Sequence, residues 1–307
     1  MDLSIITVNY NSCQHIRQCI ESTRHLDAGL SWEMLVVDNG SVDESIDYLD
    51  GLAARMPRIK IIKVGSNRGF AHASNLGATW ARGKFLMFLN PDARFSGRGI
   101  YKLIEFYLVK SKNEKVGAVG PRIINPDGSL QYNVRSFPGI WRQFLESCFL
   151  YRIKAVPFFS SYFLSWWDHR SIRKVDWISG ACLFIEKDKF LEAGGFDSGY
   201  FMYSEDTELC LQLARKGYSN YYFPFFTVIH TDSGIASRDM ALRLSQVWKS
   251  RVIYFTKNYG RPYSRAVSCL YFLGMLNRVF LSFLTGKPQT AAQFGRAIKY
   301  YFNHGYK

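Results

Sequence analysis

Two aspartates stand where an apolar, strand-like run ends, a position typical of ligand-binding residues. Asp38 follows the run at residues 33–37, and Asp92 follows the run at residues 84–89. Open α/β sheets bind ligands outside the carboxyl ends of their strands, so both carboxylates are candidates for binding. Either one could instead be only a helix cap or a turn former.

A second acidic group opens a helix pattern, and a lone histidine ends a strand pattern. Glu205 and Asp206 precede the helical spacing of residues 207–216, for which Gly217 is the expected C-cap. His230 follows the apolar pair at residues 228–229. Each has a structural explanation, because acidic residues complement a helix N-terminus and a histidine at a strand tip is more often structural.

The hydrophobic pattern predicts the scaffold that positions these residues. Short apolar runs alternate with helical spacing, which indicates a twisted, largely parallel α/β sheet. Ser41 and Glu44 match a capping box and predict that a helix follows to about residue 54. The predicted strands are residues 3–8, 33–37, 59–64, 84–89 and 176–185, and the other predicted helices are residues 12–26 and 71–81.

Composition limits the class of protein. With 307 residues, 48% of them hydrophobic, the chain can build a large core and is too apolar to be disordered. Its six cysteines form no CxxC pair, which favours free thiols in a reducing compartment over a zinc site or a disulfide scaffold. Residues 1–8 do not resemble a signal peptide, so we expect a cytoplasmic start.

The net charge of +14 is concentrated at the C-terminal end. No acidic residue follows Asp239, and a tail of one sign implies an anionic partner, either nucleic acid or a phospholipid surface. We therefore expect a domain over residues 1–239, with an aromatic helical embellishment at residues 141–167, and a basic, amphipathic helical tail over residues 240–307. The eleven cations of the tail are Arg243, Lys249, Arg251, Lys257, Arg261, Arg265, Arg278, Lys287, Arg296, Lys299 and Lys307.

Residues 266–284 are nearly long enough to span a bilayer, but Asn277 and Arg278 interrupt them. Drawn as a helix, this segment has a polar side opposite a broad apolar face, as in a helix that lies in a membrane interface. The alternative is a helix that packs on the rest of the chain or forms a homodimer contact. The polar side comprises Arg261, Arg265, Ser268, Gly274, Arg278 and Ser282.

Several motifs occur in a recognisable order between about residues 3 and 237. Each motif is weak alone, but the ordered set resembles the family 2 inverting glycosyltransferases of the GT-A fold, in particular their rhamnosyltransferase-like branch. The motifs are Ile6-Thr7-Val8-Asn9-Tyr10-Asn11, Val37-Asp38-Asn39-Gly40-Ser41, Asn67-Arg68-Gly69-Phe70-Ala71 with Asn75 and Gly77, Leu89-Asn90-Pro91-Asp92, Trp177-Ile178-Ser179-Gly180-Ala181, Glu205-Asp206 and His230.

The resemblance implies a nucleotide-sugar donor and assigns residues to it. Asp38 would accept a hydrogen bond from the N3–H of a pyrimidine, and the backbone around Val8 and Tyr10 would flank the base. The Asn67-Arg68-Gly69 loop precedes a helix and would approach the nucleotide closely, although by itself it could be an ordinary turn. Asn90 and Asp92 would lie near the diphosphate.

The resemblance also implies a divalent cation, Mg²⁺ or Mn²⁺, and a catalytic base. Asp92 and His230 match the metal-binding positions, with Asn90 in place of the first aspartate of the usual Asp-X-Asp motif. Asp206 matches the base that takes the proton of the attacking hydroxyl, and Glu205 matches a supporting catalytic residue. The segment with Trp177, Gly180 and Ala181 matches the region near the sugar and acceptor.

The expected activity is transfer of a sugar, with L-rhamnose from dTDP-rhamnose first, to a hydroxyl of a growing, lipid-linked, cell-surface glycan. A UDP-hexose or galactofuranose-type donor is the alternative. A sugar nucleotidyltransferase would have a Gly-rich phosphate loop after the first strand, where this chain has Asn9-Tyr10-Asn11. A non-catalytic protein that binds nucleic acid or membrane would not need these carboxylates, and we expect no nucleic-acid partner. The expected location is the inner face of the cytoplasmic membrane.

Overall fold

A computed structural model describes residues 1–153, 155–232 and 239–304. The chain forms two compact units. The first contains Met1–Arg135, Asp168–Phe201 and Glu205–Asp232, and the second contains Ser136–Trp167, Met202–Ser204 and the C-terminal helices. The sequence analysis assigned residues 141–167 to the larger domain, and in the structure they pack with the C-terminal helices. The end of the motif-bearing region (residues 233–237) and the predicted cation Lys307 lie outside the described residues.

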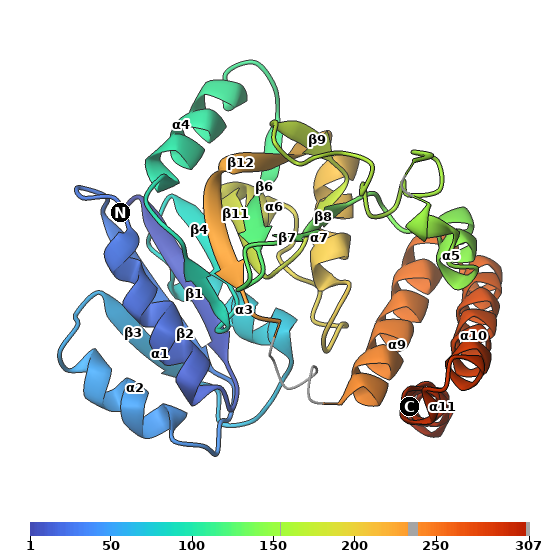
Figure 1. Cartoon of the computed structure of the whole chain (residues 1–307). Helices are drawn as coiled ribbons and strands as arrows, with labels where there is room; N and C mark the ends of the chain where they lie inside the picture. Colours follow the sequence, from blue (N-terminus) through green and yellow to red (C-terminus); the bar gives the residue numbers. More distant parts are fainter. Residues whose placement is uncertain (154, 233–238, 305–307) are drawn as a thin grey trace. The chain divides into compact units, whose positions relative to one another are not determined.

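The first unit is built on a twisted sheet of ten strands in the order β3-β2-β1-β4-β11-β6-β12-β5, with β7 paired to β6 and β9 to β12 (Figure 1). A separate pair joins β8 to β10. The strands are β1 (Leu3–Asn9), β2 (Trp32–Asp38), β3 (Ile59–Lys63), β4 (Phe85–Leu89), β5 (Ala93–Phe95), β6 (Val116–Ile124), β7 (Leu130–Gln131), β8 (Val134–Arg135), β9 (Arg173–Val175), β10 (Trp177–Ile178), β11 (Cys182–Glu186) and β12 (Ser219–His230).

Strand direction divides the sheet. Strands β1 to β4 are mutually parallel, as predicted, whereas β11 runs antiparallel to both β4 and β6. The expected α/β fold is therefore confirmed, with a mixed sheet. The predicted strand at residues 176–185 is interrupted, because residues 179–181 leave the strand conformation between β10 and β11.

Helices of the first unit follow the strands as the hydrophobic pattern predicts. They are α1 (Cys13–Ser22), the 3₁₀ turn η1 (Thr23–His25), α2 (Ser45–Ala53), α3 (Phe70–Trp80), α4 (Ile100–Ser111), α6 (Lys187–Glu192) and α7 (Glu205–Arg215). Gly77 lets α3 approach β1 closely, since a Cβ there would lie 2.6 Å from Ile6 Cγ2. Gly217, with φ of +81°, terminates the turn after α7 as expected.

The predicted capping box at Ser41 is wrong. Ser41 Oγ accepts hydrogen bonds from Asn9 Nδ2 (3.0 Å) and from the amide of Asn11 (3.0 Å), so it holds the loop after β1. Helix α2 begins only at Ser45, whose amide donates to Asp43 Oδ1 at 3.1 Å.

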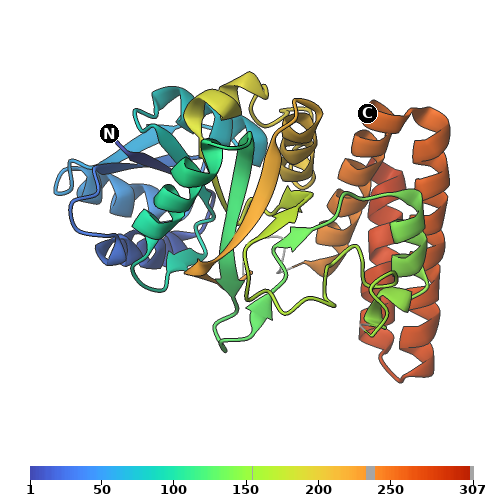
Figure 2. The ribbon, with the colours of Figure 1, turned by 90° about the horizontal axis from the view of Figure 1, so that it is seen from above.

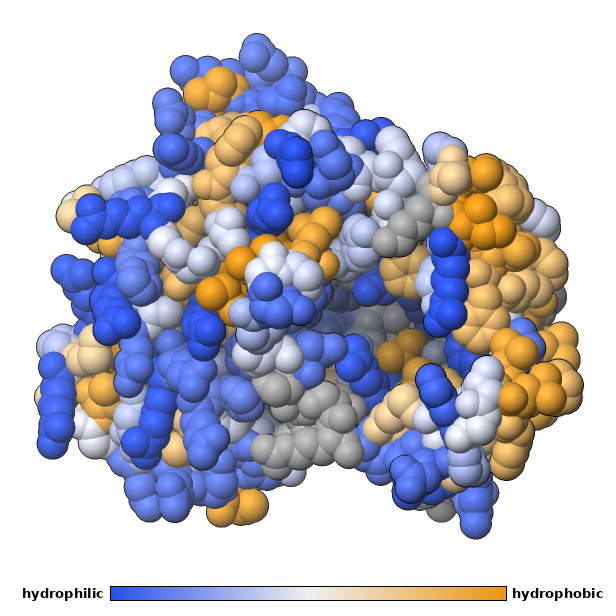
Figure 3. All heavy atoms as spheres, viewed as in Figure 1, coloured by the Kyte–Doolittle hydropathy of each residue, from blue (hydrophilic) through white to orange (hydrophobic). Residues whose placement is uncertain are grey.

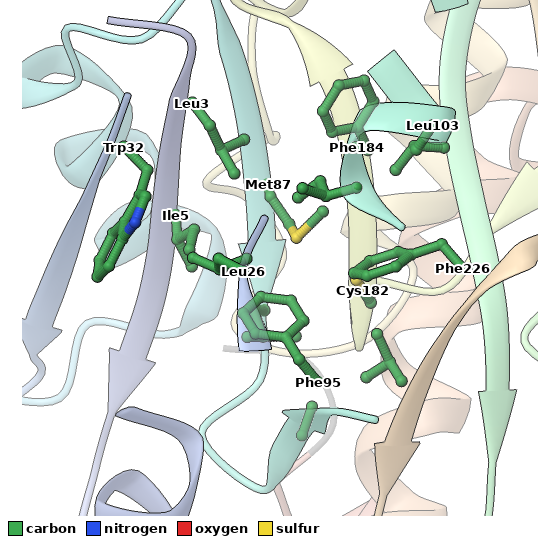
Figure 4. Packing of buried hydrophobic residues seen from close by; sticks show 14 of the residues in the cluster. Leu3, Ile5, Leu26, Trp32, Met87, Phe95, Leu103, Cys182, Phe184 and Phe226 are labelled. Atoms are coloured by element: carbon green, nitrogen blue, oxygen red, sulfur yellow. The ribbon is translucent and has the colours of Figure 1, made fainter. Parts of the chain in front are cut away.

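The core of the first unit fills the space between sheet and helices with apolar side chains from elements far apart in sequence (Figure 4). Phe85 of β4 stacks on Phe184 of β11 with ring centroids 4.9 Å apart. Leu3, Met87 and Phe184 are fully buried. This packing fixes the relative positions of the strand ends at which the candidate residues lie.

The second unit is helical (Figure 2). It consists of α5 (Ile140–Ser147), the 3₁₀ turn η2 (Leu150–Arg152), α9 (Met240–Tyr259), α10 (Arg261–Leu284) and α11 (Pro288–His304). Asp239 caps α9 by accepting hydrogen bonds from the amides of Ala241 and Leu242. The centre of this unit is Trp248, which stacks on Tyr301 with ring centroids 3.7 Å apart.

Candidate active site

The carboxyl ends of β1, β2 and β4 meet at one edge of the sheet. Strand β1 lies between the other two, all three are parallel, and Asn9 is opposite Asp38 in register. Asn90 and Asp92 follow β4 directly. This edge therefore brings together candidates that are up to 84 positions apart in the chain, from Val8 to Asp92.

Asp38 is buried and closes the turn that follows β2. Its Oδ2 accepts hydrogen bonds from the amides of Gly40 (3.3 Å) and Ser41 (3.0 Å), and its Oδ1 accepts one from Asn9 Nδ2 (2.9 Å). The turn-forming role considered from the sequence is thus present. Each carboxylate oxygen has two acceptor positions, so a further hydrogen bond to a ligand remains possible at Oδ1.

Asn39 connects this turn to the loop that precedes α3. Its Nδ2 donates to Asn67 Oδ1 (2.9 Å), and its Oδ1 accepts from the amide of Arg68 (3.1 Å). Gly69 has φ of +84°, and a Cβ there would lie 2.4 Å from the carbonyl oxygen of Phe201. These contacts fix the backbone of the loop, while the Asn67 and Arg68 side chains are exposed.

Asp92, His230 and Gln131 form a chain of contacts near the same edge. Asp92 Oδ1 lies 3.1 Å from His230 Nε2, and Gln131 Oε1 lies 2.7 Å from His230 Nδ1. Strand pairing explains the arrangement, since His230 is opposite Ala93 and both β7 and β12 pair with the end of β6.

The hydrogen bonds specify which nitrogen of His230 carries the proton. Gln131 Nε2 donates to Asn125 Oδ1 (3.0 Å), so its oxygen faces His230 and accepts from Nδ1. The lone pair of the neutral imidazole is then on Nε2 and points to the Asp92 carboxylate. Two electron-rich atoms in this arrangement require a proton or a cation between them.

The donor set fits a divalent cation as two ligands of a larger set. Adjacent ligands on an ion with bonds of about 2.1 Å lie roughly 3 Å apart, which matches the separation between Asp92 and His230. Among the described residues, no group of three or more His, Cys, Asp or Glu side chains could hold a metal. Any further ligands must therefore come from water or a bound molecule. The Asn90 side chain lies beside the pair, with its Nδ2 3.4 Å from His230 Nε2.

Gly180 and Ala181 connect this cluster to the acidic pair. The amide of Asn90 donates to the carbonyl oxygen of Ala181 (3.0 Å), and the amide of Gly180 donates to Asp206 Oδ2 (2.9 Å). The interruption between β10 and β11 thus frees backbone groups that would otherwise pair in a ladder. Gly180 and Ala181 are adjacent residues, so neighbouring backbone groups contact Asp206 on one side and Asn90, two residues before Asp92, on the other.

Glu205 and Asp206 begin α7 and differ in their surroundings. Asp206 is half-buried and also accepts hydrogen bonds from the amide and hydroxyl of Thr207 (2.7 and 3.2 Å). Burial raises the pKa of Asp206, and the Gly180 and Thr207 amides oppose that rise. Glu205 is buried, and its Oε2 has no hydrogen-bond partner among the described residues. Burial and the charge of Asp206 raise the pKa of Glu205 well above its usual range.

Arg135 adds a positive charge that the sequence analysis did not include. It is opposite Trp177 in the β8–β10 pair, with its guanidinium carbon 5.2 Å from the centre of the indole ring. Burial raises the pKa of Asp206, and the charge of Arg135 is one of the smaller contributions that oppose this rise. Trp177 is 6% exposed, so it supports Arg135 from within the protein.

The comparison with protein families decides what kind of protein carries this site. The model of glycosyl transferase family 2 matches residues 4–166, just over half of the chain. The chain belongs to this family. It is a glycosyltransferase.

Relatives within the family narrow the class further. The N-acetylglucosaminyl-diphospho-decaprenol L-rhamnosyltransferase of Mycobacterium tuberculosis is 28% identical over 270 residues, which are 84% of this chain and 85% of that protein. The rhamnosyltransferase WbbL of Escherichia coli K12 is 30% identical over 174 residues, which are 54% and 62% of the two chains. This family 2 glycosyltransferase is therefore similar to rhamnosyltransferases and, like them, acts on a glycan.

Solved structures confirm the GT-A fold. The mannosyltransferase PcManGT of Pyrobaculum calidifontis, in complex with GDP-Man and Mn²⁺, matches with a TM-score of 0.61 and 15% identity over 99% of this chain and 88% of its own. GalNAc-T7 with UDP, GalNAc and Mn²⁺ matches with a TM-score of 0.59 and 16% identity over 87% and 51%. At such identities the likeness extends to the fold alone.

The structure brings most of the predicted site residues of this glycosyltransferase to the sheet edge and the adjoining loops. Asn9, Asn39, Gln131 and Arg135 were missed as site residues. Asn9 and Asn39 stood within quoted motifs, and their position at strand ends was an available signal. Gln131 and Arg135 had no sequence signal, because only the pairing of short strands places them at the site.

Proposed function

We propose that this glycosyltransferase moves L-rhamnose from dTDP-L-rhamnose to a hydroxyl of a lipid-linked glycan intermediate, with inversion at the anomeric carbon. The observation that carries the proposal is the 2.9 Å hydrogen bond from the Gly180 amide to Asp206, which fixes the position of this carboxylate. The next residue, Ala181, accepts a hydrogen bond from the amide of Asn90, which lies two residues before Asp92. The donor sugar and the acceptor class are proposed by analogy with the mycobacterial relative, an N-acetylglucosaminyl-diphospho-decaprenol L-rhamnosyltransferase.

The nucleotide would occupy the edge formed by the ends of β1 and β2. In this proposal, Val8, Tyr10 and the loop Asn67-Arg68-Gly69 surround the base and ribose, and Oδ1 of Asp38 accepts the pyrimidine N3–H. The rigid connection from Asn39 to Asn67 supports this role, because a preformed loop lowers the entropic cost of binding. The exposed guanidinium of Arg68 is available to the diphosphate.

Asp92 and His230 would hold the divalent cation, Mg²⁺ or Mn²⁺, with Asn90 beside them. When bound, the cation stabilises the negative charge of the departing diphosphate. Gln131 would keep the metal-binding nitrogen of His230 deprotonated and correctly oriented. The solved structures of PcManGT and GalNAc-T7, which share the fold, contain Mn²⁺, and this supports the proposal.

Asp206 would take the proton of the attacking acceptor hydroxyl. The new bond from the acceptor oxygen to C1 forms while the bond from C1 to the diphosphate oxygen breaks, so one displacement inverts C1. The raised pKa of Asp206 suits a base, because proton transfer is efficient when the pKa lies nearer the working pH. Glu205 would remain protonated and support Asp206, while Gly180, Ala181 and Trp177 define the sugar and acceptor region.

A lipid-linked acceptor also requires the enzyme to work at a membrane. We propose that residues 1–239 carry catalysis, and that the basic tail keeps the enzyme at the inner face of the cytoplasmic membrane. The absence of acidic residues after Asp239 supports an anionic surface as partner.

The test is a panel of nucleotide sugars with a short-chain prenyl diphosphate-linked N-acetylglucosamine as acceptor. We expect nucleotide release and glycoside formation with dTDP-L-rhamnose, at a rate at least about tenfold above UDP-galactofuranose and UDP-hexoses, if the pocket uses one or two extra contacts to discriminate. Transfer from a UDP-linked sugar alone would overturn the donor assignment. Transfer from none of them would overturn the proposal as a whole.

A further inference from the structure

Helix α10 exposes large apolar side chains on the side turned away from the other helices. Leu273, Phe280 and Phe283 are 57%, 61% and 61% exposed, whereas its buried residues are a mixture of small, polar and apolar ones: Ser264, Val267, Tyr271, Gly274, Met275 and Ser282. An ordinary surface helix of a soluble protein presents polar side chains to the solvent instead.

Specific contacts hold the small and polar residues in the middle of this helix against its neighbours. Ser268 Oγ accepts a hydrogen bond from Trp248 Nε1 (2.9 Å). Gly274 packs so closely that a Cβ would lie 2.7 Å from Ser147 Oγ. Arg278 donates to the carbonyl oxygens of Gly274 and Glu146 (3.0 and 3.4 Å) and lies 4.8 Å from the ring centre of Phe149.

The outward side forms a continuous apolar stripe along α10. We call this set the α10 stripe, and its members are Leu273, Leu276, Phe280, Phe283 and Leu284. Their spacing of three and four residues places them on one helix face. Trp141 and Ile140 of α5, which packs on α10, are also exposed. Figure 3 shows hydrophobic side chains gathered over this part of the second unit, at the right of the view.

We propose that the α10 stripe is a lipid-contacting surface that inserts into one leaflet of an anionic phospholipid membrane. This inference rests on the proposed function, in which the enzyme works at a membrane, and it names the residues that contact the lipid. The distribution of charge around the α10 stripe indicates which partner binds it. Arg261 and Arg265 precede the stripe and Lys287 follows it, all three exposed, and no acidic residue lies on α9, α10 or α11. Each such cation near an anionic surface strengthens binding about fivefold.

The stripe is suited to lie in the membrane plane and not to cross the bilayer. Helix α10 as a whole is long and apolar enough to span, with 24 residues, but one side of it packs on α5, α9 and α11. The stripe from Leu273 to Leu284 covers about 17 Å at 1.5 Å per residue, against roughly 30 Å of hydrocarbon. The cations at both ends of the stripe favour contact with headgroups on the same side.

The test uses the full chain in co-sedimentation with vesicles of phosphatidylethanolamine and phosphatidylglycerol, and with vesicles of phosphatidylcholine alone. The variant Leu276→Ser/Phe280→Ser/Phe283→Ser removes three exposed side chains without opening the core. The matched control is Leu108→Ser/Val109→Ser on α4, whose side chains are 41% and 54% exposed. A charge variant, Arg261→Gln/Arg265→Gln/Lys287→Gln, tests the electrostatic part.

We expect the triple serine variant to bind anionic vesicles on the order of 100-fold more weakly than the wild type, with the same thermal stability. The control should bind as the wild type does, and the charge variant should lose the salt sensitivity of binding. Unchanged binding by the serine variant would overturn the proposal. So would a wild-type dimer in light scattering without vesicles that the serine variant converts to a monomer, since the stripe would then be an interface between copies of this chain.

Transfer to a water-soluble acceptor analogue separates this inference from the proposed function. If both hold, the serine variant keeps full activity on the soluble analogue and loses activity only on vesicle-borne acceptor. Vesicle binding by a wild-type chain that transfers no sugar would contradict the proposed function and would still support the α10 stripe as a lipid-contacting surface.

Discussion

The amide of Gly180 donates a hydrogen bond of 2.9 Å to Oδ2 of Asp206. Because Gly180 lies in the interruption between β10 and β11, this contact fixes the carboxylate relative to the central sheet. A catalytic base needs a fixed position as well as a suitable pKa.

Replacing Asp206 by Asn retains the shape of the side chain and removes the proton acceptor. We expect kcat to fall by roughly 10²–10⁴-fold, the usual contribution of general base catalysis. Donor binding, measured by calorimetry, should be unchanged, because the proposed pyrimidine site consists of other residues. The pH profile of the wild-type enzyme should show a rate that rises with pH as the Glu205–Asp206 pair loses a proton.

The control for this variant is Asp188→Asn, which alters an exposed acidic residue in the first turn of α6. If Asp206 only complements its helix N-terminus, the two variants should behave alike. Normal turnover by Asp206→Asn would remove Asp206 as the base, as would loss of donor binding.

Glu205 should make the protein less stable as the pH rises. Its pKa is raised in the folded protein, so above the ordinary glutamate pKa of about 4.3 the folded state holds a proton that the unfolded state has lost. Unfolding then becomes easier with pH, by up to about 1.4 kcal/mol per pH unit, until the folded-state pKa is passed. Glu205→Gln should reduce this slope to the part that the raised pKa of Asp206 contributes, and should be more stable than the wild type near neutral pH.

Urea unfolding at several pH values measures this effect, with the exposed Glu105→Gln as control. A slope that is the same in the wild type and in Glu205→Gln would contradict a raised pKa of Glu205 in the folded state. The same variant should retain sugar transfer, since the account gives Glu205 no proton to move.

Removal of the divalent cation should abolish sugar transfer. EDTA should stop the reaction, and Asp92→Ala should lose at least about 100-fold in rate, because the cation contributes several kcal/mol of charge stabilisation. Gln131→Leu should weaken Mn²⁺ binding in the presence of nucleotide by about 10–100-fold, since it frees the orientation of His230. Electron paramagnetic resonance of Mn²⁺ measures binding independently of activity.

The exposed Asp50→Ala serves as control for these measurements, because Asp50 forms a surface ion pair with Lys63. Full activity in EDTA would overturn the metal assignment. Normal Mn²⁺ binding by Gln131→Leu would show that Gln131 does not orient His230 for metal binding.

Asn39→Ala should loosen the loop Asn67-Arg68-Gly69, which we propose binds the donor. The change removes the hydrogen bonds to Asn67 and to the Arg68 amide, so the KM for the donor should rise by about tenfold, with a stability loss of about 1–3 kcal/mol for the buried polar groups left unpaired. Exposed Asn113→Ala is the control. An unchanged KM together with lower stability would show that the connection matters for folding and not for the donor.

The sequence predicted the parts of this site that depend on strand ends. Asp38 and Asp92 were placed at one sheet edge because parallel strands align their carboxyl ends. Gln131 was not predictable in this way, because β7 has only two residues and its place depends on pairing with β6. The capping box failed because Ser41 is engaged by Asn9 and Asn11, which are distant in sequence.

The orientation of α10 likewise could not be predicted from the sequence. Hydrophobic spacing identified two unlike faces, but spacing does not reveal which face packs inward. The contacts of Gly274 with Ser147 and of Arg278 with Glu146 depend on a helix more than 100 residues earlier in the chain. Only the tertiary structure supplies that information.

The anomeric configuration of the product tests the central claim most directly. A single displacement with Asp206 as base, starting from β-linked dTDP-L-rhamnose, must give an α-L-rhamnoside. One-bond C1–H1 coupling in the NMR spectrum of the purified product distinguishes the two anomers. The account predicts the α-rhamnoside, and a β-rhamnoside, formed with retention, would contradict it.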